Sequence, residues 1–286
     1  MNSIKNSHDL IYKHVYRSED IDPVYIKSVD MISEKEVEEF VKKYKSAGFV
    51  VFELLNDSTN QNVMLKIAKR FKLGEPFVPN IYLSKPEIYE KSGLNIIKAG
   101  EGTHRAFQTI NEQKIHCDGT IEPIGKIKTS ILLCITPAAV GGETIIFNSV
   151  AAFYDLYENK ESNSIMSSFL HFKALKRVAV NGEKEEYIGP SFLINNGEIS
   201  SRFSLDNTCD WDFGFRNVEF LKEAYSLMTE KITPNSPYYI ETRLKKNQGI
   251  VMANDKISHG RKEYKDGNSK REMIRGLFEI KLAYSD

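Results

Sequence analysis

The apolar positions in the first quarter of the chain follow helix and strand periods in turn. Ser33 and Glu36 are spaced as in a capping box, and the apolar residues after them recur at helical spacing until Gly48, where the helix should end. The apolar run over residues 48–55 predicts a buried strand, and residues 60–71 predict a second amphipathic helix. The segment therefore predicts two helices separated by one buried strand.

Three stretches carry no such period. Residues 1–22 are polar and mixed, and we expect an irregular arm there. Residues 77–114 are rich in Pro, Gly, Asn and Lys, which predicts a loop with short strands, the kind of segment that covers a site. Residues 181–216 are rich in Gly and Asn with scattered aromatic residues, including the only tryptophan, Trp211.

Short strands dominate the second half. The pattern predicts strands at residues 128–136, 143–147, 238–244, 249–253 and 273–282, a strand-pair element at 169–180, a helix capped by Ser149, and a helix at 218–231. Strands this short and frequent favour a β-sandwich or barrel with helices packed outside. We see no repeat or linker, so we expect one mostly β domain with flanking helices over residues 1–286.

Composition narrows the class of protein. Hydrophobic residues make up 41% of the chain, enough for a full core, and Lys+Arg and Asp+Glu are equal at 39, so no basic field favours nucleic acid or membrane lipid. The 3 cysteines form no C-x-x-C pair, which argues against a disulfide framework. The start lacks the apolar core of a signal peptide, and no run has the roughly 18 apolar residues of a membrane span. We expect a cytoplasmic enzyme with a small-molecule partner.

His116 and Asp118 are the first candidates for chemistry. They stand two residues apart at the end of a predicted strand, so that both side chains leave the same face. A neutral imidazole and a carboxylate suit a divalent first-row metal, although such a pair alone is more often a surface feature. Among the other histidines, His259 is the best third ligand, because it directly follows the strand at residues 249–253.

Four segments stand in order along the chain: Gly74-Glu75-Pro76, His116-Cys117-Asp118-Gly119-Thr120, Gly141-Gly142-Glu143-Thr144 followed by Phe147, Ser149 and Ala152, and Asn254 followed by His259-Gly260-Arg261. Together they resemble the Fe(II)/2-oxoglutarate dioxygenases of the taurine dioxygenase and clavaminate synthase-like (TauD/TfdA) family, over most of the chain. Leu73 stands where this family usually has Phe, and Ala253 where it usually has Asp. The resemblance implies a double-stranded β-helix, or cupin-like jelly roll.

The resemblance also implies the roles of site residues. His116, Asp118 and His259 would bind iron and leave three positions for 2-oxoglutarate and O2. Arg271 would bind the distal carboxylate of 2-oxoglutarate, since a guanidinium fits a carboxylate with two hydrogen bonds, and Thr144 would be its hydroxyl partner. Thr144 could instead be simply a β-favouring residue.

Residues on the substrate side are less clearly marked. Arg275 would contact a substrate anion or support the 2-oxoglutarate pocket, or else belong to a solvated basic edge. His104, Gln108 and Asn111 precede the first ligand and are candidates to line the substrate side. Trp211 is a candidate for the substrate wall, although aromatic loop residues are more often local packing.

The function that follows is hydroxylation, desaturation or cyclisation of a small molecule, such as an amino acid or a natural-product intermediate, with release of succinate and CO2. Related halogenases carry a small residue at the position of Asp118, so halogenation is disfavoured. Two alternatives remain: an oxygenase for a carrier-bound or peptidyl substrate, and a non-catalytic jelly-roll sensor that keeps a metal. A zinc hydrolase is less well supported, because no residue stands out as its general base.

Overall fold

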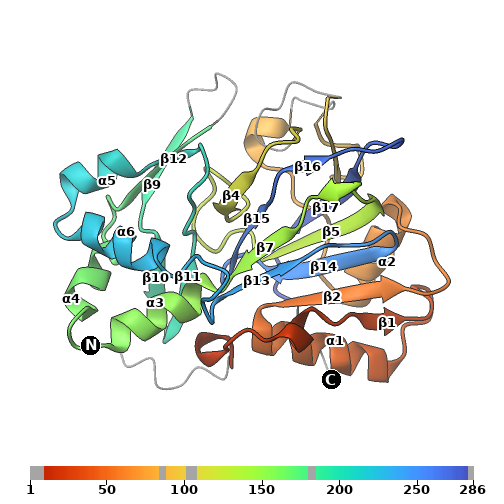
Figure 1. Ribbon diagram of the computed structural model, residues 1–286, viewed down its shortest axis with the longest axis horizontal. Helices are drawn as coiled ribbons and strands as arrows, with labels where there is room; N and C mark the ends of the chain where they lie inside the picture. Colours follow the sequence, from red (N-terminus) through yellow and green to blue (C-terminus); the bar gives the residue numbers. More distant parts are fainter. Residues whose placement is uncertain (1–9, 84–87, 101–107, 180–184, 283–286) are drawn as a thin grey trace.

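The computed structural model describes residues 10–83, 88–100, 108–179 and 185–282. Its centre is a pair of β-sheets, surrounded by helices (Figure 1). The larger sheet contains, in spatial order, β1 (Val24–Ile26), β2 (Phe49–Leu54), β14 (Gln248–Ala253), β5 (Thr129–Thr136), β17 (Glu272–Phe278) and β3 (Asn95–Lys98). The smaller sheet contains β13 (Tyr239–Thr242), β7 (Thr144–Phe147), β15 (Ser258–Arg261) and β4 (Gln113–His116).

The chain crosses between the two sheets as it advances. Strand β4 lies in the smaller sheet and β5 in the larger, β7 and β13 in the smaller, β14 in the larger, β15 in the smaller and β17 in the larger. All pairings within these sheets are antiparallel except that of β1 with β2. This is a double-stranded β-helix, and it confirms the predicted jelly roll.

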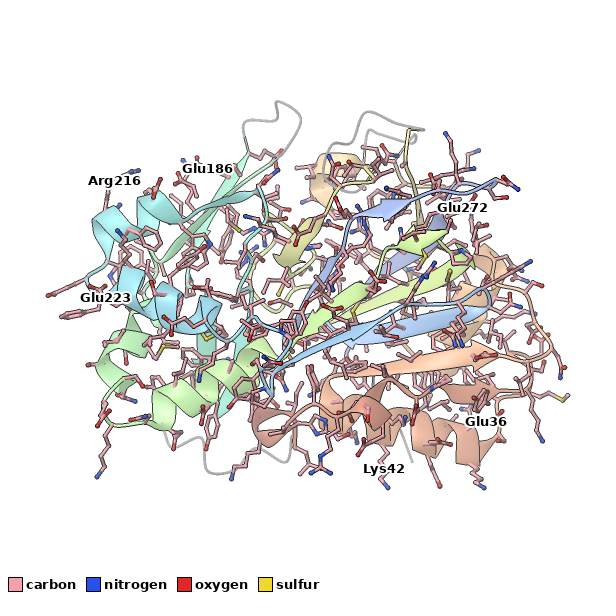
Figure 2. The ribbon with its side chains drawn as sticks, viewed as in Figure 1. Glu36, Lys42, Glu186, Arg216, Glu223 and Glu272 are labelled. Atoms are coloured by element: carbon pink, nitrogen blue, oxygen red, sulfur yellow. The ribbon has the colours of Figure 1, made fainter. Side chains whose placement is uncertain are left out.

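Two amphipathic helices cover the outer face of the larger sheet. They are α1 (Glu34–Ala47) and α2 (Gln61–Arg70), whose apolar residues pack in one cluster with Phe52, Leu133 and Val251 of the sheet. Charged side chains labelled in Figure 2, such as Glu36 and Lys42 on α1, point outward. Burying one face while solvating the other is what the sequence pattern of these helices predicts.

The ends of α1 are those that the sequence predicts. The Ser33 hydroxyl accepts from the backbone N–H of Glu36 at 3.3 Å, and the Glu36 carboxylate accepts from the backbone N–H of Ser33 at 2.7 Å. Gly48 ends the helix with φ 80°, a left-handed conformation that costs glycine little. The predicted capping box and helix stop are confirmed.

A second group of elements packs at the other end of the molecule, on the left of Figure 1. It contains α3 (Ser149–Glu158), α4 (Asn163–Met166), α5 (Trp211–Asn217), α6 (Leu221–Thr229), β8 (Leu175–Val178), β9 (Glu186–Gly189), β10 (Phe192–Asn195), β11 (Glu198–Ser201) and β12 (Cys209–Asp210). The remaining elements are η1 (Leu10–Lys13), η2 (Ser18–Ile21), η3 (Asn80–Tyr82), η4 (Ser167–Leu170), β6 (Val140–Gly141) and β16 (Tyr264–Lys265). No described helix combines the length and apolar character that crossing a membrane needs.

Several local predictions were wrong. Asn148, not Ser149, caps α3: its side chain accepts from the N–H of Ala151, while the Ser149 hydroxyl bonds Ser201 and the carbonyl of Lys256. Residues 185–216, where the sequence showed no period, hold strands and most of α5, and residues 169–179 hold one strand, β8, rather than a strand pair. The described part of the arm forms two short 3-10 turns, and its Tyr12 is buried.

Candidate active site

Strand pairing brings the three predicted metal ligands together. His116 is the last residue of β4, Asp118 lies in the turn after it, and His259 lies in β15 directly opposite His116. The two imidazole rings are 4.5 Å apart, and His259 Nε2 lies 3.5 Å from Asp118 Oδ2. All three side chains are buried, with their ligand atoms within 4.8 Å of one another.

These donors fit a divalent metal. Nδ1 of His116 lies 3.0 Å from the carbonyl oxygen of Lys114, so we assign the proton to Nδ1, which leaves Nε2 free to bind a cation. Burial, and next the neighbouring His116, lower the pKa of His259 to about 3, which keeps its imidazole neutral. Two neutral imidazoles and a carboxylate on one side form the donor set that suits non-haem Fe(II).

Asp118 is fixed from several sides. Its Oδ2 accepts from the Ser130 hydroxyl at 2.8 Å, its Oδ1 from the Arg275 guanidinium at 2.7 Å, and its backbone N–H donates to Asn254 Oδ1 at 2.8 Å. Burial alone raises the pKa of this carboxyl, but the charge of Arg275 and the hydrogen bond from Ser130 hold it well below its usual range. Asp118 is therefore ionised. Arg275 is only 7% exposed, so it is no solvated basic edge.

A cavity on one side of the triad carries excess positive charge. It is lined by His116, His259, Thr144, Arg261, Arg271 and Arg275 together with apolar residues of the sheets. Neither Arg261 nor Arg271 forms an ion pair with a carboxylate among the described residues, and Arg261 Nε has no hydrogen-bond partner there. Burial and then Arg271 lower the pKa of Arg261 to about 10. Buried cations of this kind call for an anion, and a dicarboxylate such as 2-oxoglutarate fits.

A second cavity opens on the other side. It includes Tyr82, Tyr89, Asp206 and Thr208, and it shares Gln113, His116 and Arg275 with the first. Together with the open space at its mouth, it has a volume of about 520 Å3. The triad thus lies between an anion pocket and a space for a second ligand.

Comparison with known proteins decides the family. The model described as "Taurine catabolism dioxygenase TauD, TfdA family" matches residues 17–277. The chain belongs to the TauD/TfdA family. It is an Fe(II)- and 2-oxoglutarate-dependent dioxygenase that acts on a small molecule. Of the functions that the sequence left open, this is the one that the family supports.

Relatives of this TauD/TfdA dioxygenase add detail. Uridine-5'-phosphate dioxygenase from an Amycolatopsis species is 29% identical over 261 residues, which cover 90% of this chain and 94% of the relative. A protein of the same name from a Streptomyces species is 26% identical over 256 residues, with coverages of 87% and 90%. The structure of asparagine oxygenase with Fe(II), 2S,3S-3-hydroxyasparagine and succinate matches with a TM-score of 0.63 at 14% identity, covering 88% of this chain and 81% of that one.

The other predicted substrate residues that the structure describes do not line either of the two cavities. Trp211 packs against Phe169 and Phe203, and its indole N–H donates to the Ser204 carbonyl, so it matches the packing alternative. Asn111 is exposed, and neither it nor the half-buried Gln108 is among the residues that line the two cavities. His104 lies outside the described residues.

Sequence reasoning missed several residues that line the cavities of this enzyme. Arg261 belongs to the quoted His259-Gly260-Arg261 segment, and its charge was a signal that could have been used. Asp206, Thr208, Tyr82 and Tyr89 come from stretches without a readable period, so that no pattern marked them.

Replacing Gly260 by alanine is expected to weaken metal binding and stability together. An added Cβ would lie 2.6 Å from the Gln113 carbonyl oxygen and 3.1 Å from the Ile115 nitrogen. Both are backbone atoms of β4, the strand that pairs with β15 at this point. Pushing β4 away separates His116 from His259. We expect a loss of about 1–3 kcal/mol in unfolding free energy and at least roughly tenfold in Mn(II) affinity.

Gly267→Ala is the matched control, because its Cβ would meet only the Ala139 side chain, at 3.2 Å. Thermal unfolding and metal titration compare the two variants. Equal behaviour of both would contradict the role given to the close approach of β15 and β4.

Proposed function

We propose that His116, Asp118 and His259 hold the Fe(II) of this dioxygenase, and that Arg271 and Thr144 hold 2-oxoglutarate. The observation that carries the proposal is the buried triad, which lies between a cationic pocket and a second cavity. Bound Fe(II), 2-oxoglutarate and O2 supply the oxidation of a substrate C–H bond, with release of succinate and CO2. Because Asp118 occupies the carboxylate position, the outcome is hydroxylation, or desaturation or cyclisation, rather than halogenation.

The protein's own residues orient these groups. Ser130 and Arg275 fix the two oxygens of Asp118, and the Lys114 carbonyl fixes the ring of His116. The cation of Arg271 lies under the ring of Tyr264, with 5.2 Å from its central carbon to the ring centroid, which holds the guanidinium plane in place. Thr144 is buried on β7 and lines the same pocket. Arg261 is a further cation for the 2-oxoglutarate carboxylate.

We further propose that the substrate is a free nucleoside monophosphate, with uridine-5'-phosphate as the first candidate. Two relatives that align with about nine-tenths of the chain carry that substrate in their name, whereas the asparagine oxygenase shares only 14% identity. Arg275 lines both cavities and stays a proposed substrate-side residue. We propose that residues 1–286 carry out this reaction as one domain.

Succinate formation tests both parts of the proposal. The purified protein is incubated with Fe(II), 2-oxoglutarate and O2, and with uridine-5'-phosphate, asparagine or taurine in turn. We expect succinate to form with uridine-5'-phosphate well above the level without substrate, and only when Fe(II) is present. Full turnover after metal removal would overturn the assigned metal site. No stimulation by uridine-5'-phosphate would overturn the substrate alone.

Arg271→Ala is expected to raise the KM for 2-oxoglutarate by roughly ten- to a hundredfold, because a charge-assisted hydrogen bond to a carboxylate is lost. The KM of Arg271→Lys should lie between those of the wild type and Arg271→Ala, since lysine keeps the charge but cannot form two parallel hydrogen bonds to a carboxylate. Lys270→Ala is the control, as this neighbouring side chain is exposed and its one hydrogen bond within the described residues goes to the carbonyl of Ala99, at 3.4 Å. An unchanged KM in Arg271→Ala would remove Arg271 from the 2-oxoglutarate pocket.

A further inference from the structure

Asp206 presents one carboxylate oxygen to the second cavity. Its Oδ1 accepts from the Thr208 hydroxyl at 2.6 Å, from Arg177 at 3.4 Å and from the Cys209 thiol at 3.5 Å. Within the described part of the chain, its Oδ2 receives no hydrogen bond. The side chain keeps 13% of its surface exposed and lines the cavity beside His116. Asp206 Oδ2 is therefore a hydrogen-bond acceptor that is held in place and is available to a ligand.

Arg177 alone does not explain this carboxylate. Arg177 is 1% exposed and needs a counter-ion, but its short hydrogen bonds go to neutral hydroxyls, those of Thr208 at 2.6 and 3.0 Å and of Ser204 at 2.9 Å. A carboxylate that served only as counter-ion would be expected to take the guanidinium with both oxygens. Here the charge of Asp206 is compensated by Arg177, while one of its two oxygens has no hydrogen-bond partner among the described residues.

The charge state of Asp206 is settled by its surroundings. Burial by itself raises the pKa of this carboxyl, but Arg177 and His116 lower it below its ordinary value. An ionised carboxylate only accepts hydrogen bonds. The part of a ligand that lies against Asp206 must therefore offer an O–H or N–H group.

An aromatic wall borders the same cavity. The rings of Tyr82 and Tyr89 stack with their centroids 5.4 Å apart and their planes inclined by 30°, and both residues line the cavity. Tyr89 is buried, whereas Tyr82 is only half-buried, so Tyr82 is the ring with surface left for a ligand. A flat heterocycle can stack on such a ring.

We infer that Asp206 selects the substrate by accepting a hydrogen bond from a ribose hydroxyl, while Tyr82 packs against the base. The inference rests on the proposed nucleoside monophosphate substrate and deepens it. The sugar fits the carboxylate better than the uracil edge does, because the imide N–H of uracil lies between two carbonyl oxygens that a carboxylate would repel. A ribose diol offers donors without such neighbours, and acidic residues bind ribose hydroxyls in this way elsewhere.

Binding without turnover tests the role of Asp206. The protein loaded with Fe(II) and 2-oxoglutarate is titrated in the absence of O2 with uridine-5'-phosphate, its 2'-deoxy and 3'-deoxy analogues, and 3-methyluridine-5'-phosphate. For the wild type we expect one deoxy analogue to bind roughly ten- to a hundredfold more weakly. Asp206→Asn should show the same loss with uridine-5'-phosphate and should no longer distinguish that analogue from the parent.

Controls separate this role from a structural one. Asparagine keeps an oxygen for Thr208 and Arg177, and the thermal midpoint and 2-oxoglutarate affinity of Asp206→Asn report whether the fold is intact. Asp212→Asn changes an exposed carboxylate on α5 and should bind as the wild type does. Tyr82→Leu is a second, independent variant: it should lose roughly tenfold affinity for uridine-5'-phosphate but none for ribose-5-phosphate.

The outcomes are distinct. If Asp206→Asn still binds the deoxy analogue more weakly than uridine-5'-phosphate, by the same factor as the wild type, the inference is overturned. It is also overturned if the replacement of Asp206 changes only the affinity lost on 3-methylation of the base. Unchanged binding of uridine-5'-phosphate to Tyr82→Leu would overturn the contact with the base. If the wild type binds 2-oxoglutarate but not uridine-5'-phosphate, the proposed substrate fails, and this inference fails with it.

Discussion

Replacing His116 by alanine is expected to abolish turnover, because it removes one of the three proposed iron ligands. Loss of an outer hydrogen-bond partner of a ligand already costs roughly 10–100-fold in metal affinity, so loss of the ligand itself should exceed about 100-fold. The variant should bind little Fe(II) in an anaerobic titration and should form no succinate above background.

His171→Ala is the matched control, since His171 is an exposed histidine outside both cavities. It should bind Fe(II) and turn over as the wild type does. Retained iron binding in His116→Ala, together with normal activity, would show that the metal lies elsewhere.

Replacing Arg275 by leucine is expected to cost the metal-free protein about 3–5 kcal/mol in unfolding free energy, because it leaves the buried Asp118 carboxylate without its cation. The guanidinium of Arg275 lies 2.7 Å from Asp118 Oδ1, and both side chains are less than one-tenth exposed. The measurement is denaturant unfolding of the two proteins in the presence of a chelator. Adding Mn(II) should narrow the difference, since a cation on Asp118 replaces part of the missing charge.

The effect of Arg275→Leu should also depend on pH. The folded protein holds the pKa of Asp118 below its ordinary value of about 3.9, so the pair stabilises the protein above that pH and the contribution is lost as the pH falls. The deficit of the variant should therefore be full at neutral pH and shrink in acid.

Glu272→Gln is the matched control on the same strand. The pair that Glu272 forms with Lys98, at 3.2 Å, is about one-quarter exposed, so breaking it should cost less than about 1 kcal/mol at any pH. Figure 2 shows Glu272 at the edge of the molecule. Equal losses of unfolding free energy in Arg275→Leu and Glu272→Gln would contradict the larger contribution assigned to the buried Arg275–Asp118 pair.

The elements that sequence reasoning identified are those whose local signals agree with the fold. Ser33, Glu36 and Gly48 fix the ends of α1 by chemistry that acts within a few residues. The central residues of β5 and β14 are buried on both faces of the sheet, which made these runs apolar at their centres and easy to recognise.

The strands and helix within residues 185–216 could not be predicted because their structure depends on distant partners. Strands β10 and β11 form a ribbon of their own, and β11 contacts α3, while β8 holds β9 and β12 on its two sides. Their short segments mix exposed and buried residues without a sustained period. Only the folded chain shows which side chains are covered.

Some residues of the candidate site could likewise be predicted from the sequence, and others could not. The ordered motifs were sufficient to select His116, Asp118 and His259, which the fold brings together. The ion pair of Arg275 with Asp118 was not predictable, because β17 meets the turn after β4 only in three dimensions. Asp206 and Tyr82 likewise reach the cavity from segments whose composition gave no indication of binding.

The pairing of β4 with β15 has a consequence for biosynthesis. Asp118 and Asn254, which hydrogen bond across this junction, are 136 residues apart in the sequence. Contacts between such remote segments form slowly, and a nascent chain that already exposes His116 still lacks β15 on the ribosome. Iron can therefore be captured by the three proposed ligands only after β15 has been synthesised, and a fragment ending before β15 should remain metal-free even though it contains two of these three proposed ligands.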